Sequence, residues 1–349
     1  MPGAGVSTHE SKPAGVSTHE SKPAGVSTHE SKPAGVSRRI PLWVTLLPLA
    51  LGVLVWALLW RGYAADFRAE LRAVLPAAAN IETGGFPYRL EARIADLALR
   101  HDGVVRAGLF TRELVVNRVP WQRDRQVLVA FDPDMDLAIP AIAGASVAVK
   151  APAAQASLHL SSGRIVRLSM VWPSGADIRS GLLPVPARAG HFEAHLRERE
   201  TAVDGAVAQL VLSGEEVRFG DGAPLRLSLD ADMLATAPLR ALSAWTDGGK
   251  VAVREAVVAD AGGEVARFSG HLRPEGGGLW LDGEIRTVCP ATVRAAVLGA
   301  RAAPEQRART AQILAISGRF PGGLAIPPRD DSKPLPPVRG QEAPCPLLR

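Results

Sequence analysis

An uncharged apolar run near the N-terminus constrains this chain more than any other feature. The run extends over the 21 residues from Ile40 to Trp60, IPLWVTLLPLALGVLVWALLW, and contains no charged side chain. At about 1.5 Å per residue, a helix over this run is about 31 Å long, which matches the hydrocarbon core of a bilayer. Trp43 and Trp60 lie near its two ends, where indole rings favour the headgroup region. The run therefore predicts a transmembrane helix over residues 40–60.

The flanks of this run indicate its orientation. Arg38 and Arg39 precede it directly, and paired arginines beside a span favour a cytoplasmic N-terminus, as in a signal anchor. The alternative is a cleaved secretory signal, with Gly62-Tyr63-Ala64 as the cleavage site. The apolar part of such a signal usually has about 7 to 15 residues, so the length of this run favours retention. Under both interpretations, we expect residues 61–349 to fold outside the cytoplasm.

A tandem repeat precedes the apolar run. The decapeptide AGVSTHESKP occurs three times between Ala4 and Pro33, and a fourth copy begins at Ala34. Each copy has one Val as its only large apolar side chain, so it buries too little surface to offset the entropy of ordering. We therefore predict a disordered cytoplasmic tail over residues 1–39. An alternative hypothesis is that translation starts later, for example at Val36.

The remaining chain has the pattern of an antiparallel sheet. Apolar residues make up 47% of the 349 residues, which is enough for a sizeable core. Short runs alternate between apolar and polar residues and are separated by Gly, Pro, Asp and Ser turns. This pattern predicts a mainly β domain over residues 61–326, with a curled antiparallel sheet, short helices and one apolar face. The predicted strands include residues 90–94, 145–149, 157–160, 165–172, 225–229, 251–253 and 279–285, and the predicted helices cover 66–75, 235–245, 290–298 and 304–316. Residues 327–349 are expected to form a Pro-rich, irregular C-terminal tail.

A sequence cluster after the apolar run resembles a bacterial family. The segment Gly84-Gly85-Phe86-Pro87-Tyr88-Arg89-Leu90-Glu91-Ala92 is similar to the family catalogued as domain of unknown function 2125. The resemblance continues through Gly248–Val253, Phe268–Leu272, Gly278–Gly283 and Leu335–Val338. It implies a protein anchored in the cell inner membrane, with a single span and a periplasmic C-terminal domain. The strands that end in Ser-Gly also resemble AsmA-like envelope proteins, whose apolar grooves are implicated in lipid transfer.

The sequence contains few candidates for chemistry. No Walker loop, dinucleotide fingerprint or Gly-x-Ser-x-Gly elbow is present. On one face of a strand, His191, Glu193 and His195 of the segment HFEAH have the chemistry of metal ligands, but no further ligand follows at metal-binding spacing. We therefore interpret them as a solvated strand face. The segment Asp132-Pro133-Asp134-Met135-Asp136 resembles the start of a calcium loop, but it lacks the Gly and Glu that complete one. A turn before a strand explains it equally well.

Two cysteines bear on the compartment of the domain. Cys289 and Cys345 are the only cysteines, and in an oxidising compartment they are able to form a disulfide that pins the Pro-rich tail. The sequence alone leaves open whether they pair or remain free thiols.

These observations lead to a hypothesis about function. With 40 Lys and Arg against 35 Asp and Glu, the net charge of +5 does not indicate nucleic acid as a partner. We predict no catalytic residue, no cofactor and no metal. The expected protein is a non-enzymatic, membrane-anchored envelope protein whose apolar sheet face binds or transfers lipid or another hydrophobic ligand. The second hypothesis is a structural or assembly factor that contacts other envelope proteins.

Overall fold

The computed structural model of the protein describes residues 42–77, 79–162, 164–183, 185–203, 205–235, 248–320, 323–326 and 344–347. The chain divides into two compact units, Met1–Gly52 and Val53–Arg349. The described part is mainly β, as the sequence predicts, and one apolar helix precedes the antiparallel sheet. The repeat tail and most of the Pro-rich tail lie outside the described residues.

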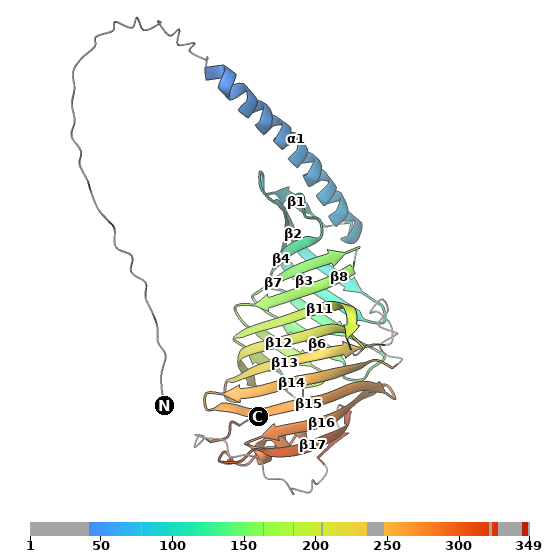
Figure 1. Cartoon of the computed structure of the whole chain (residues 1–349), viewed down its shortest axis with the longest axis vertical. Coiled ribbons are helices and arrows are strands. Elements are labelled where there is room, and N and C mark those ends of the chain that lie inside the picture. Colours follow the sequence, from blue (N-terminus) through green and yellow to red (C-terminus); the bar gives the residue numbers. More distant parts are fainter. Residues whose placement is uncertain are drawn as a thin grey trace, which may run out of the picture. The chain divides into compact units, whose positions relative to one another are not determined.

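The apolar run belongs to one long helix, α1 (Leu42–Val74), which is drawn as a single ribbon in Figure 1. The sequence predicts a transmembrane helix and a separate short helix over 66–75, but the two are continuous. No proline occurs between Trp60 and Asp66, and Ala64 and Ala65 are strong helix formers, so nothing ends the helix there. α1 is long and apolar enough to cross a membrane.

The second half of α1 packs against the first strands of the sheet. Ala64, Phe67 and Leu71 are buried in one cluster with side chains of the strands that follow. The guanidinium of Arg118 also lies over the ring of Phe67, with its Cζ atom 4.3 Å from the ring centroid. Val74, in contrast, is 74% exposed. It is the last residue of the helix and extends beyond the packed surface.

A single sheet contains all the described strands. The strand pairings among the described residues are antiparallel, which agrees with the predicted sheet type. The strands are β1 (Ile81–Gly84), β2 (Leu90–His101), β3 (Arg106–Arg118), β4 (Arg125–Phe131), β5 (Asp134–Ala138), β6 (Ser146–Lys150), β7 (Ala153–Ser161), β8 (Arg164–Trp172), β9 (Ala176–Ser180), β10 (Ala187–Ala189), β11 (His191–Val203), β12 (Ala206–Phe219), β13 (Leu225–Leu234), β14 (Lys250–Asp260), β15 (Gly263–Glu275), β16 (Gly278–Thr287), β17 (Gln312–Phe320) and β18 (Gly323–Ala325).

The curl of the sheet is strong enough to close part of it into a barrel. β3 pairs with β4 along one half of its length and with β5 along the other. β12 changes partners in the same way, because it pairs with β11 and, near Phe219, with β10. The closed ring runs through β3, β4, β7, β8, β11, β12, β10, β9, β6 and β5. Side chains that include Trp172, Phe192 and Met170 pack inside it, so the ring has a filled core.

Beyond the ring, the sheet continues as an open extension from β13 to β18. Figure 1 shows β12 to β17 following one another in chain order. A short helix, α3 (Pro290–Val297), follows β16 and packs its Val293 against Ile285 and Leu314 of the sheet. The predicted helix over 290–298 is therefore confirmed.

The other sequence predictions have mixed outcomes. All seven runs predicted as strands lie within or overlap strands of the sheet. The predicted helix over 304–316 is wrong, because residues 312–320 form β17, which pairs with β16 from Thr287 to Leu279. Leu314, Ile316 and Gly318 are buried alternately along β17, which is the period of a strand. Residues 236–245 of another predicted helix lie outside the described residues.

Candidate functional site

One face of the sheet carries a continuous apolar row that crosses twelve strands. Residues in the row are register partners on successive strands, so their side chains lie on the same face. Most of those between β4 and β15 are only half-buried. In order from β2 to β17, the row consists of Ala92, Val116, Leu128, Ala156, Met170, Ala194, Leu212, Leu229, Ala256, Phe268, Ile285 and Leu314.

An apolar pocket of about 370 Å³ lies on this face where the ring ends and the open extension begins. Its floor is formed by β11 to β14, through row residues such as Leu212, Leu229 and Ala256. Leu183 from the segment before β10 and Ala296 of α3 also line it. These walls come from parts of the chain more than 100 residues apart, so no local sequence pattern indicates the pocket. The alternation of apolar residues predicts the floor alone.

The lining of the pocket determines which ligands it suits. Besides the row residues, Phe192, Phe219, Leu227 and Val258 line it, and its side chains carry no charge. An acyl chain needs no hydrogen-bond partner, and burying its methylene groups against apolar side chains is favourable by about 0.8 kcal/mol each. The volume also falls within the roughly 300 to 1,000 Å³ of ordinary ligand pockets. The arrangement is suited to holding an apolar chain.

The three residues of the HFEAH segment lie together on β11, as the strand period predicts. His191 Nε2 lies 2.9 Å from Glu193 Oε1, and His195 Nε2 lies 3.1 Å from Glu193 Oε2. The carboxylate thus bridges the two rings. Glu193 pairs in register with Ser213 and Val171, neither of which is ionisable. Within the described residues, no group of His, Cys, Asp and Glu has the arrangement of a metal site.

These contacts predict a pH effect on stability. The hydrogen bonds from His191 and then His195 lower the pKa of Glu193 below its ordinary value of 4.5. A carboxylate with a lowered pKa stabilises the folded state above the unfolded-state pKa, and this stabilisation disappears as the pH falls through the folded-state pKa. Because all three side chains are about one-third exposed, we expect Glu193→Gln to lower the free energy of unfolding by less than about 1 kcal/mol near pH 6. The effect should shrink as the pH falls through the folded-state pKa of Glu193. Urea unfolding of both proteins as a function of pH tests the expectation, and parallel pH profiles would contradict it.

The acidic segment at Asp132 is a turn that leads into a strand. Asp134 and Asp136 belong to β5, while Asp132 adopts a positive φ of 51° and pairs with Arg112 at 2.8 Å. Asp134 and Asp136 are two residues apart and share a face of β5, but the carboxylate of Asp132 is held by Arg112, and among the described residues no group of His, Cys, Asp and Glu has the arrangement of a metal site. The second interpretation of this segment, a turn before a strand, therefore fits the structure.

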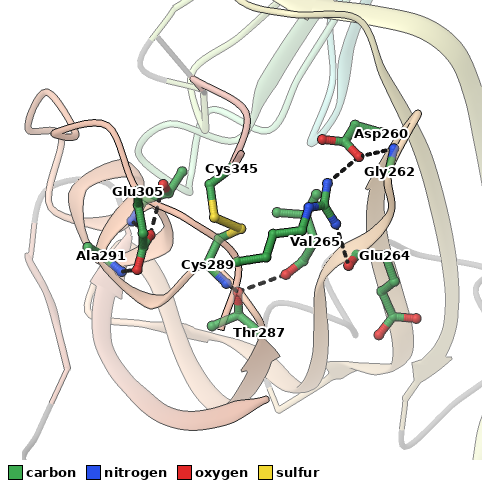
Figure 2. Close-up of a disulfide and its surroundings, with 11 residues drawn as sticks. Asp260, Gly262, Glu264, Val265, Thr287, Cys289, Ala291, Glu305 and Cys345 are labelled. Carbon is green, nitrogen blue, oxygen red and sulfur yellow. Dashed lines mark hydrogen bonds and ion pairs between the residues drawn. A yellow bond between two sulfur atoms is a disulfide. The ribbon is translucent and has the colours of Figure 1, made fainter. Parts of the chain in front are cut away.

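Cys289 and Cys345 form a disulfide, which settles the question that the sequence leaves open. Figure 2 shows it beside a set of polar contacts that fix the same region. Thr287 donates its hydroxyl to the carbonyl of Val265 at 2.7 Å and accepts the backbone N–H of Cys289 at 2.9 Å. Cys345 is buried, so this part of the C-terminal tail is packed into the domain rather than lying on its surface.

Two charged side chains complete this region. The carboxylate of Glu305 accepts the backbone N–H groups of Ala291 and Thr292, at 3.1 and 2.9 Å, and so caps the N-terminus of α3. Arg307, whose side chain is fully buried, pairs with Asp260 and donates to the carbonyl of Glu264. Sequence reasoning missed both roles, since the partners of Arg307 are more than 40 residues away.

The fold and the pocket define a class of protein: a mainly β domain with an apolar pocket, preceded by one helix able to span a membrane. No protein-family model, no curated protein and no solved structure matches the chain.

Proposed function

We propose that this chain is a non-enzymatic, membrane-anchored envelope protein that binds lipid or another hydrophobic ligand on its β domain. In this proposal α1 is a signal anchor that crosses the inner membrane once. The repeat tail is cytoplasmic and the β domain is periplasmic. The Cys289–Cys345 disulfide supports export, because disulfides form and persist in oxidising compartments such as the periplasm.

The observation that carries the proposal is the apolar pocket at the centre of the apolar row. Its half-buried row residues Leu212, Leu229 and Ala256 offer apolar surface to a bound chain. The resemblance to the domain of unknown function 2125 family and to AsmA-like proteins points in the same direction, as an expectation from the sequence. The ligand is proposed by its chemistry: an extended apolar chain.

Filling the pocket is expected to reduce lipid binding. In Ala256→Trp the indole occupies the space between Leu229 and Phe268, so we expect the purified full-length protein to retain less lipid per chain by mass spectrometry. Binding of a fluorescent phospholipid should fall in parallel. Ala296→Trp fills the same pocket from α3 and is expected to have the same effect. Because α1 holds lipid in every variant, the difference between variants is the quantity measured.

A tryptophan on the opposite face provides the control. Ser269 is exposed and adjacent to Phe268 on β15, so its side chain points away from the row. Ser269→Trp should retain as much lipid as the unmodified protein. Equal lipid binding by Ala256→Trp, Ala296→Trp and Ser269→Trp would overturn the proposal. Crosslinking in cells that captured envelope proteins but no lipid would favour the assembly-factor hypothesis instead.

A further inference from the structure

We infer that the β1–β2 turn and the β3–β4 turn rest at the boundary between the headgroups and the hydrocarbon core of the same bilayer that α1 crosses. The inference depends on the proposed membrane anchor and adds to it a second lipid-contacting surface, made by the β domain itself. We name this surface the aromatic patch and define it by Phe86, Tyr88 and Trp121.

The first observation is that α1 holds the β1–β2 turn beside its apolar segment. The indole N–H of Trp56 donates to the carbonyl of Pro87 at 3.1 Å, and that of Trp60 donates to the carbonyl of Arg89 at 3.3 Å. The ring of Trp60 also meets Phe86 edge to face, with centroids 5.4 Å apart. All these residues belong to the unit Val53–Arg349, in which Figure 1 shows β1 and β2 next to α1.

The indole ring of Trp56 also brings the β3–β4 turn into the patch. Trp121, which lies in this turn, is 6.4 Å from Trp56 between ring centroids. Phe86, Tyr88 and Trp121 are 50%, 78% and 63% exposed. Clustered exposed aromatic side chains are unusual on a surface that faces only water, and they mark a contact with another apolar phase.

The level of the patch along α1 identifies that phase. The charged residue that ends the apolar run is Arg61, and Trp56 lies five residues before it. At about 1.5 Å per residue, the Trp56–Pro87 bond is therefore about 7 Å inside the apolar end of the helix. From Trp56 toward the N-terminus of α1, exposed leucines and valines continue the apolar surface of the helix. Seating the apolar run in a bilayer thus places the patch at the boundary between the hydrocarbon core and the headgroups, where Trp and Tyr rings are most stable.

Spin-label depth measurements on the full-length chain in phosphatidylethanolamine–phosphatidylglycerol vesicles test this inference. The native cysteines form a disulfide, so an introduced cysteine is the one free thiol to label. Tyr88→Cys and Trp121→Cys report on the patch, Leu51→Cys reports on the apolar run, and Val104→Cys, 48% exposed in the β2–β3 turn, is the aqueous control. We expect labels at 88 and 121 to collide more with oxygen and less with a water-soluble nickel complex than the label at 104.

The four labels separate the possible failures. Aqueous behaviour at 88 and 121 together with lipid-like behaviour at 51 would overturn the seated patch and leave the anchor standing. Aqueous behaviour at 51 as well would overturn both. The pocket is tested independently by Ala256→Trp, so its outcome does not depend on these labels.

Discussion

Asp260→Asn is expected to lower the free energy of unfolding of the β domain by about 3 kcal/mol, because it leaves a buried cation without its counter-charge. The side chain of Arg307 is fully buried, and that of Asp260 is 14% exposed. Asp260 Oδ1 also accepts the backbone N–H of Gly262 at 2.7 Å, a bond that asparagine is able to keep. The substitution therefore changes the charge while preserving the turn. Urea unfolding of the full-length protein in detergent, followed by tryptophan fluorescence, measures the effect.

An exposed ion pair in the neighbouring strand provides the matched control. Glu275 pairs with Arg273 at 2.9 Å, and both side chains are more than half exposed. Glu275→Gln should cost less than about 1 kcal/mol. Combining Asp260→Asn with Arg307→Met removes the buried charge and should recover part of the loss. If the free energy of unfolding of Asp260→Asn lay within about 1 kcal/mol of that of the unmodified protein, the buried pair would contribute no more stability than an exposed one.

Removing the disulfide is expected to have an effect of similar size on the C-terminal region. The bond joins residues 56 apart in sequence, and closing a loop of that length in the unfolded chain corresponds to about 4 kcal/mol in the chain-entropy model. In Cys345→Ser the tail loses its covalent attachment beside α3. We therefore expect a lower melting temperature and earlier proteolytic cleavage after Leu298, read by mass spectrometry of the fragments.

A reducing agent supplies an internal control for this prediction. Dithiothreitol should destabilise the unmodified protein to the level of Cys345→Ser and should leave the variant unchanged. If the unmodified protein melted at the same temperature with and without the reducing agent, while thiol alkylation confirmed reduction, the bond would contribute no stability.

The positions of the three candidate sites illustrate how far sequence reasoning reaches. The shared face of His191, Glu193 and His195 was predictable, since it follows from the two-residue period of a single strand. The pairing of Cys289 with Cys345 was one of two open alternatives, because spacing alone does not place two segments together. The pocket was not predictable, since Leu183, Leu229 and Ala296 meet only after the sheet has curled.

β17 shows the same limit within the fold itself. Its segment contains Ile313, Leu314 and Ile316, whose spacing fits one face of a short helix as well as a strand. Pairing with β16 decides between helix and strand. In β17 the backbone N–H and C=O groups of this segment bond to β16, which precedes it in the sequence, and the apolar side chains of the two strands lie on the same face.

The amino-acid sequence by itself determined the long apolar helix, the mainly β character of the domain and its apolar face. Each of these depends on the side chains and spacing within one short segment. The tertiary structure alone decided where the sheet closes, that Arg307 is buried against Asp260, and where the pocket forms. Those features arise from contacts between residues far apart in the chain, which become neighbours only when the strand order is set.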